Sequence, residues 1–268
     1  MKIALAVAGA ERQGDPRMIE PWLYPALTAT AVLTGFVDAI AGGGGLIMLP
    51  ALLYAGLPPH VVLGTNKVQS ACGTAVAAWN YRRKGLVDIR PNLTTVAVVF
   101  AGATIGAMVI SRVDAGALRL VVPLLLMSVA LYTILSPRME DHASDPHLSP
   151  RGYAPVGGAI GFYDGFFGPG TGQFFVASLV GLRGLGLTRA TGLTKLFNVT
   201  SNIASVIVFA AGGKILWLLG LCMAAGAMLG GWLGSHSAAR FGARLIRPLL
   251  VSASLALTAR LVWGWFAG

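Results

Sequence analysis

The sequence predicts an all-α, polytopic integral membrane protein built from two homologous repeats. Of its 268 residues, 55% are hydrophobic and only 11% are charged. A soluble domain needs about 25% charged residues to cover its surface. Apolar runs of about 20 residues, the length that crosses a bilayer, recur along the chain. Short motifs also recur in the same order in both halves. These three observations place most of the protein's surface in lipid.

Long apolar runs follow one another from the N-terminal part of the chain to its end. They lie near residues 22–41, 61–81, 91–111, 117–135, 152–168, 190–212, 214–234 and 244–266. Two shorter runs, Leu46–Gly56 and Gln173–Gly181, cannot cross a bilayer alone as ordinary helices. Each follows a glycine-rich break, at 42–45 and at 168–172. We therefore expect a broken helix in each half.

The chain divides into four parts. We expect an N-terminal extension at 1–21, a first transmembrane repeat at 22–135, a polar linker at 136–151 and a second transmembrane repeat at 152–268. The extension imitates a signal peptide, but its apolar stretch is at the short end of the usual range. Met18 is an alternative start of translation to Met1.

Matching motifs indicate that the two halves arose by duplication. They are Gly35–Asp38 with Gly161–Asp164, the two glycine breaks, Asn66-Lys67 with Thr194-Lys195, Ala101–Gly106 with Ala225–Gly230, and Pro123–Leu125 with Pro248–Leu250. Similar composition alone could yield one such match, but not five in the same order.

Basic residues in the loops discriminate between two topologies. If the short segments count as crossings, the second repeat is inverted, and eleven loop Lys and Arg residues share one side while three lie opposite. If the short segments only dip into the membrane, the count becomes seven against seven. The positive-inside rule therefore favours inverted repeats with a cytoplasmic central linker.

Composition and spacing argue against several other classes of protein. The net charge of +10 would suggest nucleic acid in a soluble protein, but here most Arg residues lie at helix ends and orient the chain. Cys72 and Cys222 lie far apart in apolar runs without CxxC spacing, so we expect neither a metal site nor a redox role. The glycine runs lack GxxxxGK[ST], so nucleotide hydrolysis is not expected. We expect no cofactor, no nucleic-acid partner and no enzymatic activity.

Four charged residues interrupt apolar sequence at matched positions: Asp38, Asp164, Lys67 and Lys195. An ionisable group inside a membrane is costly unless it is paired or faces water, so each is a candidate functional residue. Two interpretations stay open for the aspartates. Either they lock their glycine loops while each lysine neutralises an aspartate, or they carry protons. The expected loop-shaping glycines are Gly43, Gly44, Gly170 and Gly172.

Both lysines lie near the start of a predicted helix, where unpaired N–H groups already favour anions. Neutral polar side chains flank them, and those expected to bind substrate are Thr65, Asn66, Gln69, Thr194, Asn198 and Asn202. Two half-helix N-termini at the breaks complete a cage for a cluster of anionic oxygens. The sequence therefore predicts one anion site between the repeats, with Lys67 and Lys195 as its cationic groups.

These motifs carry a resemblance to a known family. The segment Gly35–Gly45 followed by Gly64-Thr65-Asn66-Lys67, and its counterpart Gly161–Gly172 with Thr194-Lys195, resemble the TauE/SafE family of membrane anion exporters. The resemblance spans about residues 22–266. It implies export of sulfite or of a small organosulfonate such as sulfoacetate across the bacterial cytoplasmic membrane.

We therefore expect a multi-pass secondary transporter, driven by the proton-motive force, whose partners are a small anion and the lipid bilayer; a homodimer is compatible with the sequence. Three alternatives stay open: an importer, a channel for another small anion, and a membrane assembly factor that transports nothing. An assembly factor would not need broken helices or buried lysines.

Overall fold

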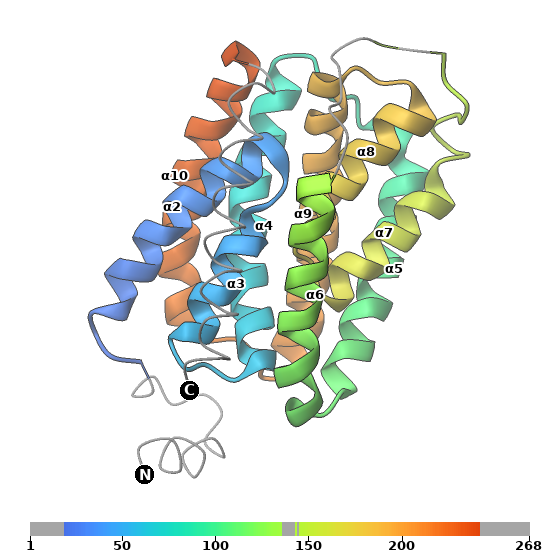
Figure 1. Cartoon of the computed structure of the whole chain (residues 1–268). Helices are drawn as coiled ribbons and strands as arrows, with labels where there is room; N and C mark the ends of the chain where they lie inside the picture. The colour runs from blue at the N-terminus through green and yellow to red at the C-terminus, as the bar shows by residue number, and fades with distance from the viewer. Residues whose placement is uncertain (1–18, 136–142, 144, 242–268) are drawn as a thin grey trace.

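The chain folds into a bundle of α-helices (Figure 1). The computed structural model describes residues 19–135, 143 and 145–241, and no β-strand occurs among them. The fold class predicted from the sequence is therefore confirmed as all-α. Most of the expected extension at 1–21, part of the linker at 136–151 and the last expected span at 244–266 lie outside the described residues.

Helices follow one another with short connections in both halves. The first half forms α2 (Leu23–Ala41), α3 (Gly44–Tyr54), α4 (Pro59–Arg83), the 3₁₀ turn η2 (Arg90–Asn92), α5 (Leu93–Arg112) and α6 (Ala115–Leu135). The second half forms α7 (Ala154–Phe166), α8 (Thr171–Arg183), α9 (Leu187–Ala211) and α10 (Trp217–Phe241). Four described segments are long and apolar enough to cross a membrane: Leu23–Ala41, Arg90–Arg112, Leu187–Ala211 and Trp217–Ala238.

Two helices differ from the predicted spans. The apolar run at 152–168 forms a helix of only 13 residues, because the Gly168-Pro169-Gly170 break follows its end at Phe166. The run at 61–81 forms the 25-residue helix α4, but much of this helix is buried inside the bundle, polar side chains included. It is a core helix, whose surroundings are mostly protein rather than lipid.

The most extensive helix contacts join the two halves of the chain. α2 packs along α10, and α5 packs along α7; Figure 1 shows each pair side by side. Glycine makes these approaches close. A Cβ atom added at Gly230 would lie 2.0 Å from the carbonyl oxygen of Val32, and one at Gly106 would lie 2.1 Å from that of Phe162. Small residues let helix backbones pack directly, and such packing drives helix association in lipid.

α4 and α9 run antiparallel to each other through the middle of the bundle. Lys67, in the first half of α4, hydrogen-bonds Asn202 in the second half of α9. Near the other end of α4, a Cβ atom added at Gly192 would lie 3.3 Å from the Cβ of Tyr81. The two helices that carry the lysines are therefore in contact over most of their length.

The two glycine breaks meet at the centre of the bundle. α2 stops at Gly42, which takes the left-handed conformation with φ 75°, and α3 begins two residues later. In the second half, Gly170 has φ 79° and immediately precedes α8. Gly42 touches the other break, because a Cβ atom there would lie 2.5 Å from the Cα of Gly172. Only glycine satisfies both the backbone conformation and this contact.

Replacing Gly230 by alanine should push α10 away from α2, because the new Cβ would lie 2.0 Å from a carbonyl oxygen. Overpacking a tight contact costs about 1–3 kcal/mol, so we expect a lower melting temperature in detergent. Gly181→Ala is the matched control, since nothing lies within 4 Å of a Cβ added there. Equal melting temperatures for the two variants would contradict the packing.

Candidate functional site

A small polar cavity of about 30 Å³ lies where the two breaks meet. It is lined by Asp38, Gly42, Gly45, Asn66, Lys67, Ser70, Thr74, Asp164, Gly168, Gly170, Thr171, Gly172, Asn198 and Asn202. Every one of these residues is polar, charged or glycine, although more than half of the chain is hydrophobic. Both halves contribute to the walls, so the cavity exists only where they come together.

Two helices begin at the cavity wall. Thr171 is the first residue of α8, and Gly45 is the second residue of α3. The unpaired N–H groups at a helix N-terminus carry partial positive charge, and this end of a helix attracts anions. Neither helix has an acidic residue in its own first turn to neutralise that charge. Each break therefore brings a helix N-terminus, with its partial positive charge, to the cavity wall.

Lys67 on α4 is held by three oxygen atoms from the second half of the chain. Its Nζ donates to Asp164 Oδ1 at 2.6 Å, to the backbone oxygen of Asp164 at 2.6 Å and to Asn202 Oδ1 at 3.1 Å. The second carboxylate oxygen of Asp164 accepts a hydrogen bond from the Ser201 hydroxyl. The side chains of the pair are only 3% and 5% exposed. Multiple hydrogen bonds of this kind offset the cost of burying two charges.

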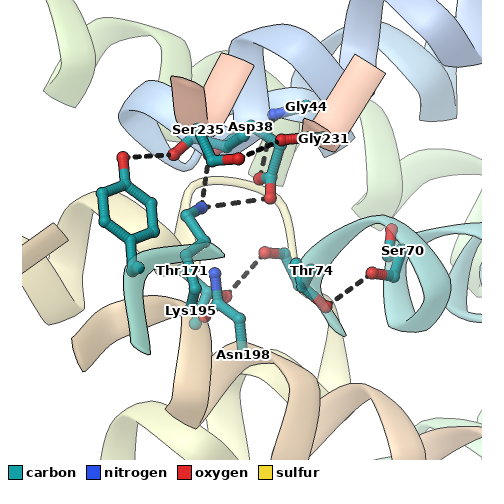
Figure 2. A network of polar contacts seen from close by, with 12 residues as sticks. Asp38, Gly44, Ser70, Thr74, Thr171, Lys195, Asn198, Gly231 and Ser235 are labelled. Atoms are coloured by element: carbon teal, nitrogen blue, oxygen red, sulfur yellow. Dashed lines mark hydrogen bonds and ion pairs between the residues drawn. The ribbon is translucent and has the colours of Figure 1, made fainter. Parts of the chain in front are cut away.

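Lys195 on α9 makes the corresponding ion pair with Asp38 at the end of α2. Its Nζ donates to Asp38 Oδ2 at 3.1 Å and also to the backbone oxygen of Asp38 (Figure 2). Tyr81 on α4 donates its hydroxyl to the backbone oxygen of Ala39 at 3.1 Å. The lysine side chain is fully buried, whereas 23% of the Asp38 side chain is exposed.

Each lysine is thus paired with the aspartate of the other half. Of the two interpretations left open by the sequence, the structure contains the pairing: each lysine neutralises an aspartate. Asp38 also accepts a 3.4 Å hydrogen bond from the backbone N–H of Gly44, as expected for a residue that holds its loop. The proton-carrying role stays a prediction. Because these four charges sum to zero, the lysines leave no surplus of positive charge, and the helix N-termini add only their partial positive charges.

Four of the residues predicted to bind substrate do not line the cavity: Lys195, Thr65, Gln69 and Thr194. The Lys195 side chain is fully buried and is bonded to Asp38, which does line the cavity. The Thr65 hydroxyl instead accepts a hydrogen bond from the Leu216 backbone N–H at 3.1 Å, and so it fixes the connection between α9 and α10. Gln69 donates to Asn66 Oδ1 at 2.9 Å and therefore orients a cavity residue rather than facing the cavity. Thr194 is fully buried, and its hydroxyl oxygen has no hydrogen-bond partner in the described part of the chain.

The four glycines predicted to shape the loops all lie at the two breaks, but only two of them line the cavity. Gly170 and Gly172 line the cavity, but Gly43 and Gly44 do not. Gly43 caps the start of α3, and a side chain on Gly44 would lie 2.8 Å from the Cβ of Asp38. The residue that turns the chain in the first half is Gly42, which the sequence analysis did not single out.

Three hydroxyl residues of the cavity wall also escaped the sequence analysis: Ser70, Thr74 and Thr171. Ser70 and Thr74 follow Lys67 by three and seven residues, just as Asn198 and Asn202 follow Lys195. This spacing places them on the lysine's own helix face. Comparing the two helices position by position would have identified Ser70 and Thr74.

One cavity residue keeps an unused acceptor. Asn198 is 5% exposed, and its Oδ1 atom is buried without a hydrogen-bond partner among the described residues. A buried polar atom without a partner is costly and uncommon.

These features define a class: a polytopic membrane protein with a small polar cavity enclosed between the two halves of its chain. The family model described as "Sulfite exporter TauE/SafE" matches residues 27–261. The chain belongs to this family, which confirms the resemblance seen in its motifs. It is a multi-pass membrane transporter and not an enzyme.

Relatives of known source are similar over nearly the whole chain. The "Probable membrane transporter protein ORF9" of Sinorhizobium sp is 43% identical over 237 residues, which cover 88% of this chain and 91% of the relative. YfcA of Escherichia coli K12, also a probable membrane transporter protein, is 40% identical over 249 residues and 92% of each chain. A probable membrane transporter protein of Haemophilus influenzae is 40% identical over 247 residues, 91% of this chain and 97% of the relative. No solved structure matches the chain.

Breaking the most buried ion pair from one side should destabilise the protein strongly. Lys67→Met leaves the Asp164 carboxylate buried without its cation, and removing one partner of a buried pair costs about 3–5 kcal/mol. The double variant Lys67→Met/Asp164→Leu removes both charges and should recover much of that loss. Thermal unfolding of purified protein measures both. A double variant no more stable than the single one would contradict the pairing.

Proposed function

We propose that this transporter exports a small sulfur-containing anion, sulfite or an organosulfonate such as sulfoacetate, across the bacterial cytoplasmic membrane. The family's own description names sulfite export, and the relatives are bacterial membrane transporter proteins. The observation that carries the proposal is the polar cavity at which two helix N-termini meet between the paired lysines.

The cavity wall suits a compact cluster of oxygen atoms. The starts of α3 and α8 supply backbone N–H groups, and Ser70 and the asparagine amides supply further donors, whereas the Thr171 hydroxyl already donates to Gly168. The volume of about 30 Å³ is small; a single water needs roughly 10–15 Å³ on the same scale. Of the two substrate classes, this size favours sulfite over a longer organosulfonate.

We further propose that the two repeats have inverted topology, with the linker at 136–151 in the cytoplasm. The corresponding helices α4 and α9 run antiparallel, and each pairs its lysine with the opposite repeat. Inverted repeats typically enclose their substrate near the bilayer midplane and expose it to each side in turn as one repeat moves against the other. The cavity between the breaks is the place where this motion would bind and release the anion.

The proton-motive force is the proposed source of energy, acting through its electrical component. The bacterial cytoplasm is negative, so an anion that leaves it moves down the potential. Each elementary charge gains about 2.3 kcal/mol per 100 mV. Export therefore needs no chemical energy beyond that potential.

Sulfite should stabilise the purified protein against heat more than sulfoacetate does. A ligand at 100 times its dissociation constant adds about 2.7 kcal/mol of stability. A panel of sulfite, sulfoacetate, sulfate and acetate, each at two pH values, measures the preference as shifts in melting temperature. Stabilisation by acetate alone, or by none of the four anions, would exclude sulfur anions as the substrate.

Transport should depend on both lysines of the two ion pairs, Lys67 at the cavity wall and Lys195 beside Asp38, and not on a lysine elsewhere. Lys67→Gln and Lys195→Gln remove a cation from the site, and we expect sulfite efflux from reconstituted vesicles to fall at least tenfold per folded molecule. Lys84→Gln is the control: Lys84 Nζ donates to the Ser235 backbone oxygen at 3.0 Å, outside the cavity, and partial burial lowers its pKa.

The direction of transport and its rate distinguish an exporter from an importer and from a channel. An importer would accumulate sulfite against an outward gradient, and a channel would pass it at rates that do not saturate with concentration. Unchanged efflux in both lysine variants would show that the lysines do not serve the substrate.

A further inference from the structure

The two ion pairs of the cavity are not equivalent. The Asp164 side chain is 5% exposed, whereas the Asp38 side chain is 23% exposed and lines the same cavity. Asp164 accepts hydrogen bonds from Lys67 at 2.6 Å and from the Ser201 hydroxyl, one on each carboxylate oxygen. Asp38 has only the 3.1 Å contact with Lys195 and the 3.4 Å contact with Gly44. Both carboxylates accept one hydrogen bond on each oxygen, but Asp38 is held at longer distances and is more exposed.

Sequence differences between the two repeats explain this asymmetry. Ser201, which binds Asp164, lies six residues after Lys195, and the residue six positions after Lys67 is Gly73, which has no side chain to offer Asp38. Asn202, which binds Lys67, lies seven residues after Lys195, and its counterpart is Thr74. The Thr74 hydroxyl donates to the backbone oxygen of Ser70 at 2.6 Å instead of helping Lys195.

Few other charged or titratable groups face Asp38. Besides Lys195 on α9, α4 contributes Lys67, which is paired with Asp164 of α7, and Tyr81, whose hydroxyl is bonded to Ala39. From α10, the His236 ring contacts Asn80 and the Trp232 backbone oxygen rather than Asp38. The described residues of α3 and α8 add no charged side chain to the cavity wall.

We propose that Asp38 is the proton-binding group of the transporter and that Lys195, once Asp38 is protonated, becomes the counter-ion of the anion. The Lys67–Asp164 pair is a structural ion pair that stays formed throughout transport. This assignment rests on the proposed function as an anion transporter. It follows from the partly exposed carboxylate of Asp38, held at 3.1 and 3.4 Å, and from the buried carboxylate of Asp164, held at 2.6 Å by its lysine.

The step is a simple transfer of one proton. A proton from the aqueous side adds to a carboxylate oxygen of Asp38 and forms a neutral carboxylic acid. Lys195 stays charged and loses its counter-ion, so the four charges of the cavity change from a sum of zero to +1. An anion then takes the place of the lost carboxylate charge beside Lys195, with the two helix N-termini as further support. When the anion leaves, Asp38 loses its proton and the ion pair forms again.

Proton and anion therefore bind together and travel together. For a dianion, one accompanying proton leaves a net charge of −1 on the transported pair, which the membrane potential still drives outward. Under this scheme the affinity for the anion falls as pH rises, because fewer molecules hold a proton on Asp38.

Proton uptake by the purified transporter during sulfite binding tests the assignment. Isothermal titration calorimetry in buffers of different ionisation enthalpy counts the protons taken up. Sulfite itself also exchanges protons when it binds. Asp38→Asn, titrated with the same sulfite solution at the same pH, measures that contribution, which is subtracted from the value of the wild type. We expect the wild type to take up as much as one proton more than Asp38→Asn. We also expect the affinity of the wild type for sulfite to fall by up to tenfold for each unit that the pH rises. Asp38→Asn should lack this fall.

Asp88→Asn is the control, because it removes a carboxylate that lies outside the cavity and should keep the proton uptake of the wild type. Asp164→Asn tests whether the other ion pair takes up the proton instead. An infrared difference spectrum of the wild type needs no variant at all. Addition of sulfite should produce the carbonyl band of a protonated carboxylic acid, and that band should be absent with Asp38→Asn.

The outcomes separate this inference from the proposed function. Sulfite binding with equal proton uptake in the wild type and Asp38→Asn, and with no carboxylic acid band, would overturn the role of Asp38 and leave export of sulfite intact. Loss of the pH dependence in Asp164→Asn alone would assign the proton to the other pair and would also overturn it. Failure of sulfite to bind at any pH would remove both proposals.

Discussion

The placement of four charged side chains at the centre of the bundle, three of them buried, is the constraint on which the rest of the structure depends. A charge at that depth is tolerated only beside an opposite charge or a polar cavity, so Lys67 requires Asp164 and Lys195 requires Asp38. Both pairs join the two halves of the chain. The halves must therefore meet at their glycine breaks, and the cavity with its two helix N-termini lies where they meet.

Two properties of the surrounding helices make that meeting possible. Glycine at the α2–α10 and α5–α7 contacts, such as Gly230 and Gly106, brings the backbones close enough for charges on different helices to reach each other. The short helix α3 is anchored on its apolar sides, since Met48, Leu49 and Leu52 are completely buried. Its N-terminus is thus held at the cavity by hydrophobic packing, together with the hydrogen bond from the Gly44 N–H to the Asp38 carboxylate.

The sequence predicted those features that depend on local composition and on lipid as the solvent: the all-α membrane class, both breaks and the four charges inside apolar sequence. It left the pairing of the charges open, because the partners are 97 and 157 residues apart and only the tertiary fold brings them together. Thr65 shows another limit. It is near Lys67 in sequence, but residues two apart on a helix do not share a face, so it holds a loop instead. The asymmetry between Asp38 and Asp164 depends on single residues such as Ser201 and Gly73, which no pattern marks.

The pairing between halves also bears on how the protein is made. Synthesis runs from the N-terminus, so Asp38 and Lys67 are translated before their partners Lys195 and Asp164 exist. At about 5–20 residues per second, the ribosome needs roughly 5–30 s to reach those partners. During that interval the nascent first half must keep an acid and a base away from lipid without their final contacts. The charges that organise the finished transporter are thus unsatisfied during its biogenesis, until the second half has been inserted.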